Sequence, residues 1–293
     1  MKKYSYAYGY KLLFSSLKEE NNLKTIYIDK IDKFPSNNFK KTINFHTNQN
    51  RMIYLKVIND FKTEKSFEKW LFVVDGVISF LCDTKTNQVY YQKDYDYTDE
   101  RRDYWLIHIV LPMFFTLKKS YYLLHTGAVN INNKAVLFTG NSYAGKSTLT
   151  DYFLKKKHNL LSDDKLATFK KDDMFYCVPS HPYHRPYRGV EDLGVKTDNF
   201  DTKQLAIDKI YWLKPVKEND DILISELTGI KKFEVLRYST EMDLSVDLDR
   251  FKYITDLANT IQVYEIQIPR NMDRLEEVYH SIMTHSKNSD EDI

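Results

Sequence analysis

The sequence GNSYAGKS at residues 140–147 fits the pattern G-x-x-x-x-G-K-[ST] of loops that hold nucleotide phosphates. Gly140 and Gly145 allow the backbone to fold tightly around an anion with its N–H groups pointing inward. Lys146 can reach the β- and γ-phosphates, and the Ser147 hydroxyl can bind the Mg²⁺ that bridges them. The chain has only 8 glycines, which makes an accidental match rarer still. The stretch therefore predicts binding of ATP with Mg²⁺.

The sequence on either side of this stretch supplies the context that the motif requires. KAVLFTG at 134–140 is typical of a buried strand, because four apolar residues are followed by small ones. STLTDYFLKK at 147–156 has the apolar spacing of a helix. A surface loop that only matches the pattern is the alternative. The predicted nucleotide-binding residues are Gly140, Asn141, Ser142, Tyr143, Ala144, Gly145, Lys146, Ser147 and Thr148.

Length and composition restrict the remaining possibilities. A chain of 293 residues with 42% hydrophobic residues can form one large domain or two smaller ones. The 43 basic and 41 acidic residues give a net charge of +2, so we expect neither nucleic acid nor a membrane as a partner. Cys82 and Cys177 form no ligand or disulfide pattern, and they fit a reducing cytoplasm. The first 14 residues contain no apolar run of signal-peptide length.

Residues 1–98 are predicted to form a small β-rich domain. Short or alternating apolar runs recur at 24–28, 52–57, 70–75, 77–82 and 88–93. Asp75-Gly76 between two of these runs is a strong hairpin signal, and turns are expected at Asn37-Asn38 and at 84–87. No group of residues in this stretch has the pattern of a catalytic or metal-binding site, so we expect a scaffold or recognition domain.

Residues 99–120 change in character. Charged ends surround a mostly apolar run of 14 residues from Tyr104 to Leu117, which Pro112 interrupts. The run is too short for a bilayer, so it predicts a buried helix that bridges two domains. His108 within it is expected to be a core histidine.

Two acids follow the phosphate-binding stretch at short distance. Residues 121–140 predict a hairpin with its turn at Asn132-Asn133, and Leu160-Leu161 begins a strand that ends in Asp163-Asp164. At the carboxyl end of such a strand, one carboxylate can take a proton from an attacking hydroxyl and its neighbour can bind magnesium. Since adjacent side chains on a strand point apart, the pair should lie where the strand breaks into a loop. A plain acidic turn is the alternative.

The stretch VPSHPYHRPYRGVEDLG at 178–194 predicts a loop stiffened by proline. Arg185 or Arg188 can clamp the transferring phosphoryl group, and Glu191 can complete the metal shell. A solvated basic loop is the alternative. His181 and His184 flank a proline with no cysteine pair nearby, which is weak evidence for zinc.

The remainder of the chain is predicted to be scaffold. Strands are expected at 206–214 and 263–269, and helices at 225–239, 247–261 and 273–285. The last residues, 287–293, are polar and expected to be disordered.

Three ordered pieces of the chain resemble a known family. His125-Thr126-Gly127-Ala128-Val129, then GNSYAGKST and then LLSDD resemble the catalytic domain of HPr kinase/phosphorylase over about 121–285. They are more similar to the smaller HPr-kinase-like proteins of peptide-modifying gene clusters, including lasso-peptide kinases. AYGYKLLFSS at 7–16 resembles the front part of those relatives. The resemblance implies that Lys146, Ser147 and Thr148 handle phosphates and metal. It further implies that Asp163 is the base, Asp164 a metal-side acid and His125 an active-site residue near the γ-phosphate.

The chain departs from HPr kinase/phosphorylase after the acids. That family has a second signature with an Arg-Gly-x-Gly loop, whereas this chain has Arg188-Gly189 without the spacing that follows. The resemblance therefore implies neither phosphorylase activity nor HPr as the substrate. We expect Arg188 to be the clamp, because Gly189 beside it allows close approach of the backbone to an anion.

These observations predict an α/β fold with a β-rich domain at 1–98, a bridging helix at 99–120, a phosphate-loop kinase domain at 121–286 and a tail at 287–293. The predicted activity is transfer of the γ-phosphoryl group of ATP to a hydroxyl, with serine as the expected acceptor, on a peptide, protein or small molecule. A regulatory ATP-binding protein and a metabolic small-molecule kinase are the alternatives. The acceptor and the presence of a homo-oligomer stay open.

Overall fold

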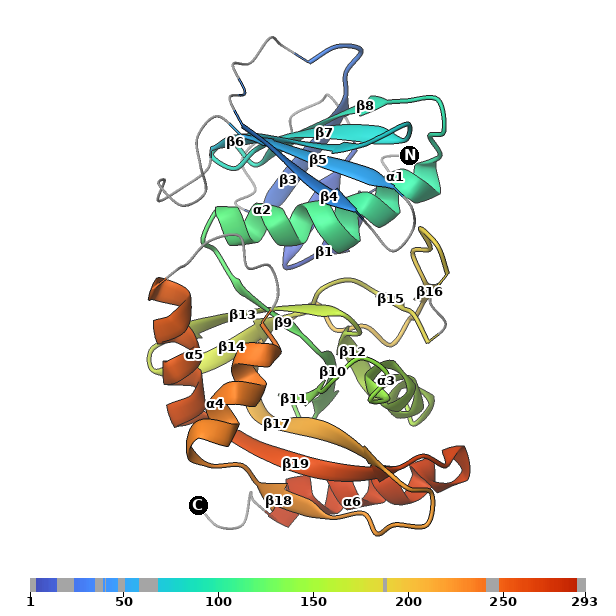
Figure 1. Cartoon of the computed structure of the whole chain (residues 1–293), viewed down its shortest axis with the longest axis vertical. Helices are drawn as coiled ribbons and strands as arrows, with labels where there is room; N and C mark the ends of the chain where they lie inside the picture. Colours follow the sequence, from blue (N-terminus) through green and yellow to red (C-terminus); the bar gives the residue numbers. More distant parts are fainter. Residues whose placement is uncertain are drawn as a thin grey trace. The chain divides into compact units, whose positions relative to one another are not determined.

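The computed structural model describes residues 4–14, 24–34, 39, 41–46, 51–57, 68–186, 189–240 and 248–288. The chain forms a mixed α/β structure, so the predicted fold class is confirmed at this level (Figure 1). Its contacts divide into two units. The first comprises Met1–Leu123, Tyr187–Val195 and Met242–Asp247, and the second Leu124–Pro186, Lys196–Glu241 and Leu248–Ile293. No helix in the described part of the chain is both long and apolar enough to cross a membrane.

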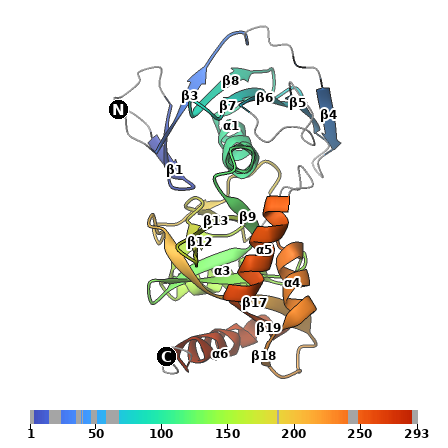
Figure 2. The same cartoon turned by 90° about the vertical axis from the view of Figure 1, so that its left-hand side faces the viewer.

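The first unit is built on one sheet that curves around a helix, as Figure 2 shows. Its described strands pair in the order β1-β2-β3-β8-β7-β6-β5-β4. The strands are β1 (Tyr4–Ala7), β2 (Tyr10–Leu13), β3 (Thr25–Lys30), β4 (Lys41–His46), β5 (Met52–Val57), β6 (Lys69–Val74), β7 (Ile78–Asp83) and β8 (Gln88–Lys93). Strands β4 to β8 are antiparallel neighbours, whereas β3 runs parallel to both β2 and β8.

Turn chemistry explains the hairpins of this sheet. Gly76 has φ +74°, and with Asp75 it connects β6 to β7 as expected. Residues 84–87 connect β7 to β8, with Asn87 in the left-handed region at φ +55°. The turn expected at Asn37-Asn38 lies outside the described residues.

The apolar run after residue 98 forms a continuous helix within the first unit. It consists of α1 (Asp99–Trp105), the π-helical turn η1 (Leu106–Val110) and α2 (Leu111–Leu117). The Thr98 hydroxyl caps α1 by accepting a hydrogen bond from the Arg101 N–H at 3.2 Å. The π-helical turn ends two residues before Pro112, which has no N–H to continue the regular helical ladder. His108 is buried as expected, and its Nε2 lies 3.3 Å from the Leu193 carbonyl oxygen.

The second unit contains a mixed sheet. Its described strands pair in the order β12-β10-β11-β17-β14-β13-β9, and β19 pairs with both β17 and β18. The strands are β9 (Tyr122–His125), β10 (Gly127–Ile131), β11 (Lys134–Thr139), β12 (Asn159–Ser162), β13 (Lys165–Lys171), β14 (Met174–Val178), β17 (Leu205–Val216), β18 (Ile224–Glu226) and β19 (Gln262–Pro269). A separate short ladder joins β15 (Tyr183–His184) to β16 (Val195–Lys196). The helices are α3 (Lys146–Lys155), α4 (Gly229–Tyr238), α5 (Leu248–Thr260), the 3₁₀ turn η2 (Met272–Arg274) and α6 (Leu275–Asn288).

Parallel pairing at the centre of this sheet positions the phosphate-binding stretch. Strand β11 runs parallel to β17, which runs parallel to β19. Helices α3 and α6 pack on the sheet through a buried apolar cluster that includes Phe138, Phe153, Tyr211 and Ile282. The GNSYAGKS loop therefore lies at the carboxyl end of β11, the edge at which α/β sheets bind ligands.

Local signals explain most of the second unit and fail at one helix. Asn132 and Asn133 both have positive φ, +52° and +61°, as the tight turn between β10 and β11 requires. The helix predicted over 225–239 is shorter, because 224–226 pair with β19 as strand β18 and Gly229, at φ +56°, begins α4. Helix α6 continues to Asn288, beyond the predicted start of the tail.

Candidate active site

The GNSYAGKS loop connects the last residue of β11 to the first residue of α3. Gly140 has φ +153°, and a Cβ added there would lie 3.0 Å from the Leu213 carbonyl oxygen. Gly145 precedes the helix at φ +98°, so both glycines are needed where they stand. No described side chain caps this end of α3. Its first-turn N–H groups, together with the helix dipole, favour an anion at this position.

The side chain of Lys146 is hydrogen-bonded to the backbone of its own loop. Its Nζ donates hydrogen bonds to the carbonyl oxygens of Gly140 at 2.8 Å and Asn141 at 3.2 Å. The side chain is buried, so its charge is held against the loop backbone. By contrast Tyr143 is 98% exposed and has φ +63°, a conformation that few residues other than glycine adopt.

The two acids lie in the bend between β12 and β13, where the strand breaks as predicted. Asp163 and Asp164 are 6% and 8% exposed. The Thr126 N–H donates to the Asp164 carbonyl oxygen at 2.9 Å, which ties the bend to the junction of β9 and β10. Backbone pairing therefore brings His125 to the same place as the acids.

Asp163 is held by a backbone group and keeps one oxygen available. Its Oδ2 accepts a 2.6 Å hydrogen bond from the Arg185 N–H, and its Oδ1 is buried without a hydrogen-bond partner among the described residues. Burial raises the pKa of Asp163 to about 6, and the charge of Asp164 acts in the same direction. The Arg185 N–H and the nearby Ser147 hydroxyl lower the pKa and limit the rise.

Asp164 is the centre of a cluster of basic groups. Its Oδ2 lies 3.2 Å from Lys165 Nζ and 3.5 Å from Arg185 Nη2, and its Oδ1 lies 3.5 Å from His125 Nδ1. Lys165 was not among the residues predicted from sequence, although a lysine directly after an acid pair is a signal that could have found it. The structure thus brings together Asp163, Asp164, His125 and Arg185 of the residues named from sequence and adds Lys165.

The loop predicted over 178–194 divides between the two units after Pro186. His181 is buried, and burial lowers its pKa to about 4, so its ring is neutral at pH 7. His184 Nδ1 lies 3.7 Å from Asp151 Oδ1. Within the described ranges no group of three or more His, Cys, Asp and Glu side chains could hold a metal ion. Arg188, the expected clamp, lies outside the described residues.

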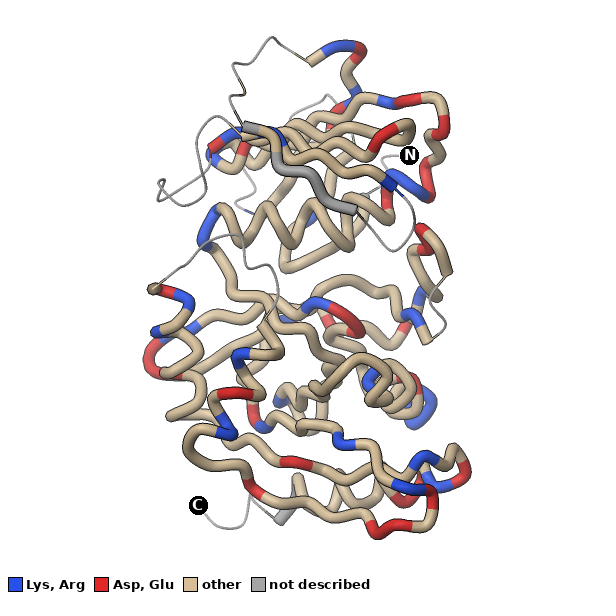
Figure 3. Tube along the Cα trace, in the orientation of Figure 1, with Lys and Arg blue, Asp and Glu red and all other residues tan. Residues whose placement is uncertain are grey.

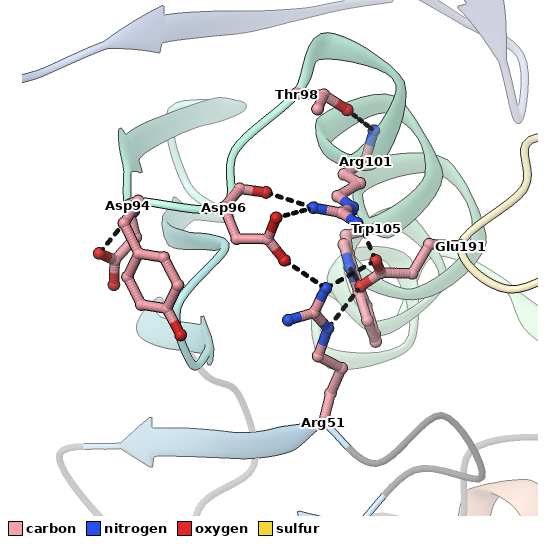
Figure 4. Close-up of polar contacts among 8 residues, drawn as sticks. Arg51, Asp94, Asp96, Thr98, Arg101, Trp105 and Glu191 are labelled. Atoms are coloured by element: carbon pink, nitrogen blue, oxygen red, sulfur yellow. Dashed lines mark hydrogen bonds and ion pairs between the residues drawn. The ribbon is translucent and has the colours of Figure 1, made fainter.

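Glu191 belongs to the first unit, where its side chain is buried. Its carboxylate accepts two hydrogen bonds from Arg51, at 3.2 and 3.1 Å, and one from Trp105 Nε1 at 2.9 Å (Figure 4). Arg101 Nε lies 2.9 Å from the same carboxylate. Two arginines and an indole thus contact both oxygens of this carboxylate, and the metal-binding role expected of Glu191 stays a prediction.

A contact far away in sequence supports the site from α4. The Ser239 carbonyl oxygen accepts a 2.6 Å hydrogen bond from the His125 N–H, and the hydroxyls of Ser239 and Thr139 are hydrogen-bonded. The end of α4 therefore joins the strand end that carries His125 to the residue before Gly140. No local pattern could have predicted this contact, because 100 residues separate Thr139 from Ser239.

Charges of both signs are interspersed along the described chain (Figure 3), as the net charge of +2 leads one to expect. No family model matches the chain. No curated protein matches it either. Among solved structures, the HPr(Ser) kinase/phosphatase from Coxiella burnetii is similar, with a TM-score of 0.36 and 14% identity. The match covers 57% of this chain and 98% of that chain. It is a distant similarity of fold.

Proposed function

We propose that this protein is a kinase that transfers the γ-phosphoryl group of ATP to a hydroxyl, with Mg²⁺ as the metal. We expect the acceptor to be a serine in a peptide or protein. A small-molecule alcohol is the alternative acceptor, and its phosphorylation would use the same site residues. One observation carries the proposal. A buried carboxylate, Asp163, has a pKa of about 6 and lies near Ser147 of a complete phosphate-binding sequence.

The nucleotide phosphates would bind in the loop from Gly140 to Thr148. The N–H groups at the start of α3 point toward an anion there, and the dipole of the helix adds to the attraction. Lys146 would exchange its bonds to the Gly140 and Asn141 carbonyl oxygens for bonds to phosphate oxygens. A charge-assisted bond of this kind is stronger than the bond to a neutral carbonyl that it replaces.

Asp163 is proposed as the general base. It would accept the proton of the acceptor hydroxyl while the acceptor oxygen forms a bond to the γ-phosphorus. The bond from that phosphorus to the β–γ bridging oxygen breaks, and ADP leaves. A pKa of about 6 keeps Asp163 largely ionised at pH 7 and leaves it more basic than an ordinary carboxylate.

The basic groups around Asp164 are proposed to offset charge that develops on the transferring group. Arg185 takes this role in place of Arg188, because Arg185 lies against both acids. Lys165 and His125 add two further donors at the same carboxylate. Asp164 would thereby position these groups rather than act on the substrate itself.

One magnesium ion is proposed beside Ser147, whose hydroxyl lies near the buried Asp163. Mg²⁺ commonly binds through few protein ligands together with phosphate oxygens and water, so Ser147 and the nucleotide would supply most of its shell. Asp164 was expected to complete it, but Lys165 and Arg185 already balance the charge of that carboxylate, which argues against direct coordination. When bound, the ion would neutralise charge on the phosphates.

A non-catalytic ATP sensor is the competing function. Such a protein needs the loop and a metal ligand, but it has no use for a buried carboxylate with a pKa near neutrality. Asp163 therefore favours the enzyme.

The test compares Lys146→Ala with Lys155→Ala, a change of an exposed lysine on the same helix. ATP and Mg²⁺ binding is measured by calorimetry, and transfer of labelled phosphate is measured with a library of serine peptides and with small alcohols. We expect Lys146→Ala to lose at least roughly 10²-fold in turnover while Lys155→Ala resembles the wild type. Turnover by folded Lys146→Ala at the wild-type rate would refute the proposal. Wild-type protein that binds ATP tightly but transfers no label would favour the sensor.

A further inference from the structure

Tyr143 occupies a turn position that favours glycine. The Ala144 N–H donates a 3.1 Å hydrogen bond to the Asn141 carbonyl oxygen, which closes a four-residue turn within the GNSYAGKS loop. Backbone φ is positive at Tyr143, the third residue of this turn, and not at Ser142, the second. That combination is the mark of a type II turn, whose third residue is normally glycine or asparagine. For a bulky side chain, the left-handed conformation at φ +63° carries a cost in conformational energy.

The fold does not offset this cost by burying the ring of Tyr143, which is 98% exposed. Tyr8 of the first unit is the other tyrosine with positive φ in the described part of the chain, at +52°. Tyr8 is 0% exposed, its hydroxyl donates to the Ile107 carbonyl oxygen at 3.4 Å, and its ring centroid lies 5.6 Å from that of Phe115. Packing thus stabilises the strained backbone of Tyr8. An exposed tyrosine is ordinary by itself, but a strained position without such packing is typical of a functional site.

The geometry of phosphoryl transfer indicates which reactant Tyr143 faces. In an in-line displacement, the attacking hydroxyl and the departing ADP lie on opposite sides of the γ-phosphorus. The proposed base, Asp163, marks the side of the hydroxyl, and Asp163 and Asp164 are 6% and 8% exposed. A side chain that is 98% exposed lies outside this buried pair. The nucleoside, which projects from the phosphates on the ADP side, is therefore the part of the reactants that the ring can cover.

We propose that Tyr143 stacks on the base of the bound nucleotide. The phosphates need only backbone N–H groups and Lys146, so an aromatic ring adds nothing to their binding. A ring does add contact with a base, because every base presents a flat π-face on which an aromatic side chain can stack. This role rests on the proposed function only in that a nucleotide occupies the loop. It does not require that the phosphoryl group is transferred.

The test compares two ligands of the full chain by calorimetry. Mg²⁺-ATP has phosphates, ribose and base, whereas Mg²⁺-tripolyphosphate has the phosphates alone. We expect Tyr143→Ala to raise the Kd for ATP roughly 5- to 100-fold, as the loss of one stacked base costs, and to leave the Kd for tripolyphosphate within about twofold. Tyr143→Phe keeps the ring and is the matched control, so its Kd for ATP should stay within about twofold of the wild type.

Tyr143→Gly separates the loss of the ring from damage to the loop. Glycine adopts positive φ without strain, so this variant should unfold at a higher urea concentration than Tyr143→Ala. Since both variants lack the ring, Tyr143→Gly should nevertheless bind ATP as weakly as Tyr143→Ala. Affinity for ATP at the wild-type level in Tyr143→Gly would overturn the proposal.

Three further results would also overturn it. Equal losses of affinity for ATP and tripolyphosphate in Tyr143→Ala would limit the residue to the phosphate loop. Unchanged affinity for ATP, with a raised KM for the acceptor, would assign the ring to the acceptor. A wild-type protein that binds neither ligand would end the nucleotide site and the proposed function together. If the wild type binds ATP but transfers no phosphate, the proposed kinase alone fails, and the Kd values still decide the role of Tyr143.

Discussion

The N–H of Arg185 donates a 2.6 Å hydrogen bond to Asp163 Oδ2, while the guanidinium of the same residue lies 3.5 Å from Asp164 Oδ2. One residue therefore engages both acids, one through its backbone and the other through its side chain. A change of Arg185 to alanine keeps the backbone N–H that donates this bond, so the position of the loop and the charge of the guanidinium can be tested separately.

Replacing Arg185 by alanine should remove the charge and leave the bond to Asp163 in place. By comparison with other arginines that stabilise a transferring phosphoryl group, turnover should fall about 10³-fold or more. The Kd for ATP should change little, because Lys146 and the loop bind the phosphates. Arg188→Ala is the matched control, and we expect it to cost less than about tenfold. The reverse order of the two variants would return the role of clamp to Arg188.

Asp163 and Asp164 should respond differently to replacement by asparagine. Asp163→Asn removes the base and should lose most of the turnover while ATP still binds with Mg²⁺. Asp164→Asn should loosen Arg185, Lys165 and His125, which lowers turnover and leaves the magnesium dependence of ATP binding unchanged. Calorimetric titration of each variant with ATP, with and without Mg²⁺, measures the affinity for ATP and its magnesium dependence. A loss of magnesium dependence in Asp164→Asn would restore the metal-side role expected from the sequence.

The pH dependence of the reaction should report Asp163. A base must be ionised to take a proton, and its pKa of about 6 lies above the usual 3.8. We therefore expect kcat/KM to rise with pH up to about 6 and then to level off. In Asp163→Asn the residual activity should lack this acidic limb. An acidic limb that persists unchanged in the variant would assign it to another group.

The same raised pKa should lower stability at neutral pH. The fold favours the protonated carboxyl, so this contribution to stability is present below pH 3.8 and is lost as pH rises through about 6. Asp163→Asn has no charge to bury and should unfold at higher urea concentration than the wild type at pH 8, by up to about 3 kcal/mol. The difference should shrink at pH 4.5. Equal stability of the two proteins at pH 8 would mean that the ionised carboxylate has partners that compensate its burial.

Sequence reasoning succeeded where the signal is local. The strand before Gly140, the helix after Gly145 and the bend at the two acids all follow from short patterns, and the turn at Asn132-Asn133 follows from two residues that tolerate positive φ. These elements need only neighbouring residues to be specified. That is why their bounds agree with the structure to within a residue or two.

Sequence reasoning has no signal for the parts of the site that depend on pairs far apart in the chain. The choice of Arg188 rested on the adjacent Gly189, whereas the backbone bond that places Arg185 joins residues 22 positions apart. The pairing of Glu191 with Arg51 spans 140 positions, and that of Ser239 with Thr139 spans 100. Such contacts depend on how strands and helices assemble. A carboxylate that resembles a metal ligand in the sequence can therefore be paired with arginines in the fold.

Gly127 lies within the HTGAV sequence that precedes the phosphate-binding loop. A Cβ added at this position would lie 2.2 Å from Thr150 Oγ1, far inside van der Waals contact. Thr150 is buried on α3, and its Oγ1 donates to the Lys146 carbonyl oxygen at 3.0 Å. Gly127→Ala should therefore push the start of α3, and with it Lys146, away from β10. We expect a loss of about 1 to 3 kcal/mol in stability and weaker ATP binding.

Thr150→Ala removes the obstructing atom, so the double variant should recover part of what Gly127→Ala loses. Urea unfolding and ATP titration of the two single variants and the double variant form a double-mutant cycle. A coupling of at least about 1 kcal/mol in the favourable direction is expected. Additive losses would show that Gly127 is required for its backbone rather than for the close approach of α3. In the expected case, Gly127 serves the nucleotide indirectly, by letting the helix that begins with Lys146 pack directly on the strand that follows His125.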